Sequence, residues 1–86
     1  MIEYEVIINH LVNNACVAME EGDYEEGTFY QNLNNFEVCH VPKEDELDEI
    51  ACCDIFFELQ IDPIEGLEEE FERFVEFRRS LTVPRN

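Results

Sequence analysis

The residues that could do chemistry are four cysteines, two histidines and a large excess of carboxylates. Cys39–His40 and Cys52–Cys53, together with His10, are the candidates for a metal site. Zinc ligands usually stand two to four residues apart, which lets one turn of chain place both on the same ion, whereas adjacent side chains point in different directions. The spacing therefore predicts no metal and no cofactor, and it predicts thiols that pack as small hydrophobes.

Catalytic chemistry is no better supported by the residue pattern. Cys39 and His40 are neighbours in sequence, which does not by itself make a nucleophile and its base. The chain has only three glycines and no Gly-rich loop for phosphate. General acid–base catalysis needs a carboxylate in an apolar pocket, whereas the acids here are expected on exposed faces. Residues 19–27 look like a calcium loop but lack its alternating oxygen ligands. We expect a protein that is not an enzyme.

Charge is the most unusual property of the chain. It has 22 Asp and Glu against 5 Lys and Arg, a formal net charge of −17. Solubility requires a net magnitude of only about 2–8 in a small domain, and the excess opposes folding by self-repulsion. Residues 44–72 contain no Lys or Arg, whereas residues 73–86 contain four Arg. A nucleic-acid ligand and an anionic membrane are excluded as direct partners, because both need basic residues.

Length and composition indicate one folded acidic domain over residues 1–86. Hydrophobic residues make up 45% of the chain and include seven Phe, a content that a disordered acidic tail lacks. No stretch approaches the roughly 20 apolar residues of a membrane span, and the first residues lack the positive charge of a signal peptide. We expect a cytoplasmic protein, in a bacterial or infected host cell, with free thiols.

Two helices are predicted in the first half of the chain. Apolar residues at helical spacing favour a helix over residues 4–21, with Gly22 as its cap, although Ile2 and Tyr4 also begin a strand-like alternation. Asp23 and Glu26 have the spacing of a capping box and favour a second helix over residues 24–35. The alternative for residues 36–41 is a short extended piece.

Two more helices are predicted in the second half. Residues 43–60 carry a broad apolar arc, which is typical of a central buried helix. Asp62 as cap and Pro63 at the first position begin the fourth helix, and Pro84 stops it. The sum predicts an all-α fold, a compact bundle of about four helices. The alternative is an α+β fold with a small sheet from residues 2–9 and 36–41.

Acidic residues gather in three clusters that we expect to face outward. Carboxylates three or four residues apart on a helix lie about 5–6 Å from each other, and a rigid row of them imitates a phosphate backbone. Such a row can occupy a protein surface that grips nucleic acid through Lys and Arg. The expected partner-binding residues are Glu20, Glu21, Asp23, Glu25 and Glu26, then Glu44, Asp45, Glu46, Asp48 and Glu49, and finally Glu65, Glu68, Glu69, Glu72 and Glu76.

In size, charge and lack of catalytic motifs, the chain resembles the small acidic inhibitors that phages and mobile elements encode. These include DNA-mimic anti-restriction proteins and anti-CRISPR proteins. The resemblance implies a bacterial target whose nucleic-acid groove is blocked, and it carries over no functional residue. The predicted function is therefore a nucleic-acid-mimicking inhibitor whose partner is the basic surface of a nucleic-acid-binding protein.

Two other functions compete with this prediction. One is an acidic adaptor or small chaperone for a basic protein, anchored by exposed aromatics such as Phe77 or Tyr30. The other is an adaptation to high salt, in which the acids hold water and ions. The chain is expected to be a monomer or dimer, and residues 74–83 would form a dimer contact. The arginines that could pair with acids of a second copy are Arg73, Arg78, Arg79 and Arg85.

Overall fold

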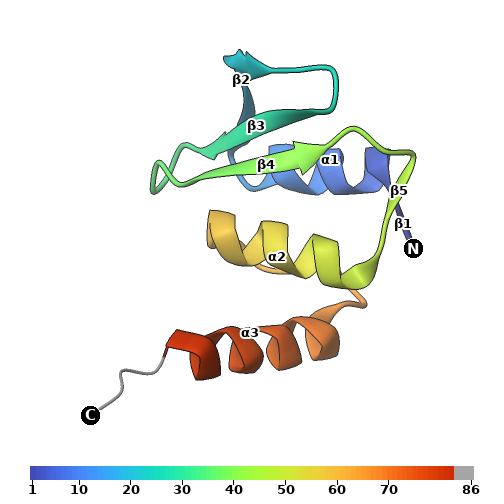
Figure 1. Cartoon of the computed structure of the whole chain (residues 1–86), viewed down its shortest axis with the longest axis vertical. Helices are drawn as coiled ribbons and strands as arrows, with labels where there is room; N and C mark the ends of the chain where they lie inside the picture. The colour runs from blue at the N-terminus through green and yellow to red at the C-terminus, as the bar shows by residue number, and fades with distance from the viewer. Residues whose placement is uncertain (83–86) are drawn as a thin grey trace.

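The computed structural model describes residues 1–82, which form an α+β fold of three helices and two small antiparallel sheets (Figure 1). The predicted all-α bundle is wrong, because most of the chain between residues 16 and 42 is extended. The α+β alternative names the right class, but its strands are only partly correct. Residues 2–3 and 38–41 are extended, as that alternative requires, yet they belong to different sheets.

The elements follow one another in an order that places the helices at both ends of the chain. They are β1 (Ile2–Glu3), α1 (Tyr4–Asn13), β2 (Cys16–Asp23), β3 (Gly27–Asn32), β4 (Val38–Pro42), β5 (Glu46–Leu47), α2 (Glu49–Leu59) and α3 (Glu68–Thr82). Strands β2, β3 and β4 make one sheet in that order, and β1 pairs with β5. Figure 1 shows the larger sheet, α2 and α3 as successive layers, with α1 beside the sheet.

The first predicted helix is right at its start and wrong at its end. It stops at Asn13, because the Asn14 side chain donates to the His10 carbonyl at 2.8 Å and Ala15 takes a left-handed φ of 62°. An Asn side chain that bonds nearby backbone competes with helix continuation, and the left-handed residue turns the chain away. The residues from Cys16 onward then run as β2 instead of the second half of a helix.

The second predicted helix does not form, and its residues make a β-hairpin with β2. Tyr24 and Gly27 exchange backbone hydrogen bonds across a turn of two residues, Glu25 and Glu26. Asp23 does not cap a helix, because its carboxylate accepts from the Thr28 hydroxyl at 2.9 Å. Residues 19–22 bulge opposite β3, where the strand register shifts between Ala18 and Asp23.

The last two helices begin later than predicted. Within residues 43–48 only Glu46–Leu47 form a strand, β5, and Asp48 caps α2 by accepting from the Ala51 amide at 2.7 Å. Asp62 and Pro63 do not begin α3, because Gly66 adopts a φ of 99° that breaks the helix before Glu68. The predicted stop at Pro84 lies outside the described residues. Within residues 1–82, no helix combines the length and apolar character needed to cross a bilayer.

The core lies between the larger sheet and the first two helices. Ile7 and Leu11 from α1, Val41 from β4, and Phe56 and Leu59 from α2 are completely buried within it. Three of the four cysteines are also buried, and all four are free thiols. The prediction that these thiols pack as small hydrophobes is therefore confirmed for Cys16, Cys52 and Cys53.

Arg78 of α3 makes charged contacts with α2, in addition to the apolar packing of Phe71 against the core. Arg78 forms ion pairs with Asp54 at 2.9 Å and Glu58 at 3.0 Å. Its guanidinium also lies 4.8 Å from the centre of the Phe57 ring, which makes an edge contact with Phe74 at 5.9 Å. Charge pairing and cation–π attraction thus act together at the layer boundary.

Candidate functional site

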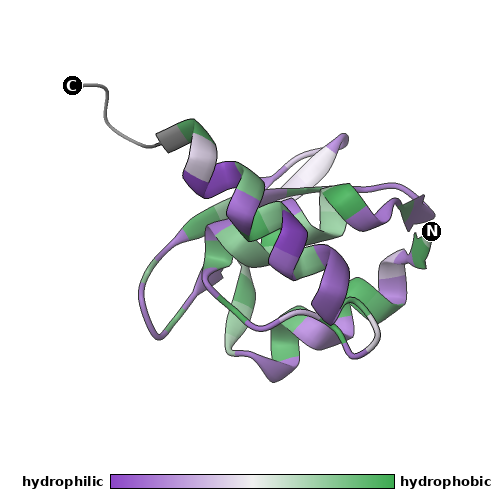
Figure 2. Cartoon of the chain, turned by 90° about the horizontal axis from the view of Figure 1, so that it is seen from below, coloured by the Kyte–Doolittle hydropathy of each residue, from purple (hydrophilic) through white to green (hydrophobic). Residues whose placement is uncertain are grey.

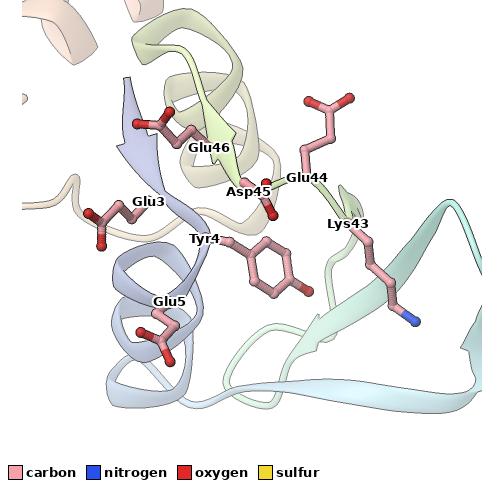
Figure 3. A pocket seen from close by; sticks show the side chains of 7 residues that line it. All are labelled: Glu3, Tyr4, Glu5, Lys43, Glu44, Asp45 and Glu46. Atoms are coloured by element: carbon pink, nitrogen blue, oxygen red, sulfur yellow. The ribbon is translucent and has the colours of Figure 1, made fainter.

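An open cleft beside the first helix gathers carboxylates from two distant parts of the sequence. The cleft has a volume of about 800 Å³. We call it the acidic cleft and define it by its lining residues, Glu3, Tyr4, Glu5, Lys43, Glu44, Asp45 and Glu46. Figure 3 shows the Tyr4 ring between the segment that carries Glu3 and Glu5 and the segment that carries Lys43 to Glu46. Five carboxylates and one aromatic ring therefore line the same cleft.

The acidic cleft exists because β1 pairs with β5. Ile2 lies opposite Leu47, which is buried and anchors the pairing to the core. The Tyr4 amide extends the ladder by donating to the Asp45 carbonyl at 2.9 Å. The same register places Glu3 directly opposite Glu46, and like charges in that position oppose the pairing. Burial of the apolar partners therefore holds two carboxylates together against their repulsion.

The Tyr4 side chain packs against the core next to the larger sheet. This side chain is half-buried, and the neighbouring Tyr30 of β3 is buried. Burial, and then the Tyr4 hydroxyl, raise the pKa of the Tyr30 hydroxyl. The prediction that Tyr30 is an exposed anchor is wrong, because this side chain is part of the core. Tyr4 instead presents an aromatic surface within the acidic cleft.

Lys43 connects the acidic cleft to the β2–β3 hairpin. Its ammonium group lies 2.7 Å from an Asp23 carboxylate oxygen, and its amide donates to the Glu26 carbonyl at 3.1 Å. Lys43, and then the Thr28 hydroxyl, hold the pKa of Asp23 below its usual value of 3.8. The first two predicted acidic clusters therefore meet around Lys43, although Glu20 and Glu21 lie farther back along β2.

Some predicted partner-binding residues have local structural roles. Asp48 caps α2, and Glu49 pairs with the terminal amino group at 2.9 Å, which lowers the pKa of the Glu49 carboxyl. Glu68 accepts from the Gly66 amide at 2.8 Å and so closes the turn before α3. These three carboxylates are less available to a partner than Glu44, Asp45 and Glu46, which are exposed.

The third predicted cluster lies on a different part of the molecule. Glu69, Glu72 and Glu76 line a separate shallow hollow of about 330 Å³ on α3, together with Arg73. Glu65 is in the turn before the helix. Helix α2 separates α3 from the larger sheet (Figure 1), and Figure 2 shows α3 from its outer side, where hydrophilic residues predominate over its first turns. The fifteen predicted residues therefore form two surfaces and not one continuous array.

Sequence reasoning missed Glu3, Tyr4 and Glu5 as site residues. They are about 40 positions away from residues 43–46 in the chain, and a helix prediction from residue 4 gave no reason to join the two segments. The strand-like alternation of Ile2 and Tyr4 was the available signal, because a strand at residues 2–3 needs a partner strand.

The thiols and histidines offer little chemistry in the described part of the chain. Burial raises the pKa of the Cys39 thiol to about 12 and that of Cys52 to about 11, so neither is a ready nucleophile. His10 is engaged with the Asp62 carbonyl at 2.7 Å. Among residues 1–82, no three His, Cys, Asp or Glu side chains are grouped so that they could hold a metal ion.

The acidic cleft is suited to binding cationic side chains. A Lys or Arg from a partner can pair with carboxylates of the acidic cleft, and an Arg can also stack on the Tyr4 ring. Comparison of the chain with protein-family models, with curated proteins and with solved structures gives no match. The geometry of the acidic cleft is therefore the basis on which a function is proposed.

Proposed function

We propose that this chain binds a Lys- and Arg-rich surface of a nucleic-acid-binding protein and inhibits it by occupying the place of the phosphates. The acidic cleft is the observation that carries this proposal. Its five carboxylates come from two segments held by the β1–β5 pairing, and Lys43 joins the cleft to Asp23 of the β2–β3 hairpin. A basic groove built to neutralise closely spaced phosphates is complementary to such a surface.

Charge also favours fast encounter with such a partner. The net charge of −17 produces a field that attracts basic surfaces over about a Debye length, which is roughly 8 Å at physiological salt. Close contact then depends on the carboxylates that protrude from the cleft. The affinity is therefore expected to fall steeply as salt is added.

Affinity capture on the immobilised chain, followed by competition, tests the proposal. Captured proteins should release labelled DNA or RNA when the free chain is added, and their affinity for the chain should fall about tenfold or more between roughly 0.05 and 0.2 M salt. A captured protein that binds nucleic acid and the chain at the same time, with an affinity insensitive to salt, would contradict the proposal.

Neutral variants locate the contact. A variant with the acidic cleft neutralised (E3Q, E5Q, E44Q, D45N and E46Q) should lose displacement of nucleic acid. The matched control neutralises five exposed carboxylates outside both the acidic cleft and the row on α3 (E20Q, E21Q, E37Q, D62N and E65Q) and should retain most of it. Equal loss in both variants would show that total charge, and not the acidic cleft, determines binding.

A further inference from the structure

Helix α3 and the start of α2 leave an apolar surface uncovered. An open hollow of about 400 Å³ lies there, which we call the apolar groove and define by its lining residues, Ile50, Glu70, Arg73, Phe74 and Phe77. Ile50 is 72% exposed and Phe77 is 57% exposed. Large apolar side chains clustered at the surface of a small domain mark an interaction site more often than scattered ones do.

The apolar groove continues along α3 as a helical stripe. Phe74, Phe77 and Leu81 follow the i, i+3, i+7 spacing, and Leu81 is 65% exposed. Phe74 is the inner edge of the stripe, because its ring contacts Phe57 of α2 at 5.9 Å. Ile50 comes from the first turn of α2 and forms the opposite wall. An apolar stripe on one helix with a facing side chain from another is a form that suits a helix laid along it.

Negative charge borders the apolar groove chiefly on the α3 side. On α3, the hollow lined by Glu69, Glu72 and Glu76 lies beside the groove, and Arg73 lines both hollows. At the other wall, Asp48 and Glu49 precede Ile50, but Asp48 caps α2 and Glu49 is paired with the terminal amino group. Arg73 neutralises little of this charge, since its pair with Glu70 is 3.8 Å long and its side chain is 72% exposed.

We propose that the apolar groove seats an amphipathic, basic helix of the partner. Its apolar side chains would fill the space between Ile50, Phe74 and Phe77, and its Lys and Arg would face the acidic row on α3. The inference rests on the proposed function, in which the partner surface is basic. It adds a second contact, which requires that the partner carry an amphipathic helix. A second copy of this chain is the weaker candidate, because each copy carries a net charge of −17.

A designed peptide provides the probe. It has about 18 residues, or five helical turns, with Leu along one face and Lys elsewhere. A scrambled peptide of the same composition has the same charge but no apolar face. The amphipathic peptide should bind at least tenfold more tightly by calorimetry. Its amide shift changes in NMR spectra should centre on Ile50, Phe74 and Phe77.

Substitutions in the full chain identify the contact. The double variant I50S/F77S should lose at least tenfold in affinity for the amphipathic peptide. The control V12S/L33S removes two side chains of similar exposure, from α1 and from the turn after β3, and should bind as the unmodified chain does. Arg73→Ala removes a cation that borders the groove and should raise the affinity two- to threefold or more.

The possible outcomes separate this inference from the proposed function. Equal affinity for the two peptides, with I50S/F77S unaffected, would overturn the groove as a docking site while leaving a basic partner in place. No binding of either peptide, even in low salt, would contradict both the groove as a docking site and the proposed binding of a basic partner. Dimers in sedimentation measurements that vanish in I50S/F77S would mean that a second copy covers the groove, which would also overturn the inference. Shift mapping on the unmodified chain decides the matter even if a variant folds poorly.

Discussion

Arg78 gives the sharpest test of how the layers are held together. Its substitution by Met removes ion pairs to Asp54 and Glu58 at 2.9 and 3.0 Å and a cation–π contact with Phe57 at 4.8 Å. Partly exposed ion pairs each contribute up to about 1 kcal/mol, and the ring contact contributes about 0.5–1 kcal/mol. Asp54 and Glu58, one helical turn apart, would then also repel each other.

The expected loss in the free energy of unfolding is about 2 kcal/mol. In a domain of this length, such a loss lowers the melting temperature by roughly 8–16 °C. The assay is thermal unfolding followed by circular dichroism at about physiological salt, where distant charges are largely screened. Raising the salt further should narrow the difference from the unmodified chain, because part of it is electrostatic.

Arg73→Met is the matched control for this experiment. It removes the same charge from the same helix, but its ion pair with Glu70 is 3.8 Å long and its side chain is 72% exposed. The expected loss is below about 0.5 kcal/mol. If Arg73→Met and Arg78→Met lowered the melting temperature equally, net charge alone would explain both results, and the assignment of Arg78 as the link between α2 and α3 would be refuted.

Three further predictions concern the backbone, acid stability and the thiols. Ala15→Gly should stabilise the fold by up to about 1 kcal/mol, because Ala15 has a φ of 62°, and a lower midpoint in urea unfolding would contradict this. The pKa of Asp23 is held below 3.8 by Lys43 and then by Thr28, so the stabilisation from this contact is present above pH 3.8 and is lost as the pH falls through the lowered pKa. In the Asp23→Asn variant, the free energy of unfolding should therefore fall less between about pH 5 and pH 2 than in the unmodified chain. An equal fall in both proteins would count against this prediction. Burial raises the pKa of Cys39 to about 12 and of Cys52 to about 11, so a thiol reagent at about pH 8 should label them far more slowly in native protein than in urea, and similar rates would show that they are accessible.

The helices were partly predictable from sequence because their apolar residues recur with the helical period. Ile7 and Leu11 on α1 and Phe56 and Leu59 on α2 are buried, and all four lie within predicted helices. The sheet was not predictable, since β2 is an edge strand whose bulge over residues 19–22 removes the two-residue alternation. Local signals such as the Asp23–Glu26 spacing fit a helix cap equally well, and tertiary pairing with β4 decided the outcome.

The exposure of the acids was predictable, but their grouping was not. Carboxylates without basic neighbours stay in water, so residues such as Glu44, Glu72 and Glu76 were expected to be exposed, and they are. Which acids meet depends on a two-residue strand pairing between positions 2–3 and 46–47, and pairings that short leave almost no pattern in sequence. The apolar groove was equally difficult to foresee, because Ile50 and Phe77 are far apart in the chain and have the same residue types as the core.

Because Glu3 and Glu46 lie opposite each other, the order of the amino-terminal segment should depend on whether the acidic cleft is occupied. A cation that enters between them relieves the repulsion across the β1–β5 ladder, so bound partner and well-ordered terminus reinforce each other by the same free energy. The Tyr4 amide, which donates to the Asp45 carbonyl, sits at this junction. The exchange rate of the Tyr4 amide proton with solvent should therefore fall when the acidic cleft is filled. This rate can be measured as a signal of binding.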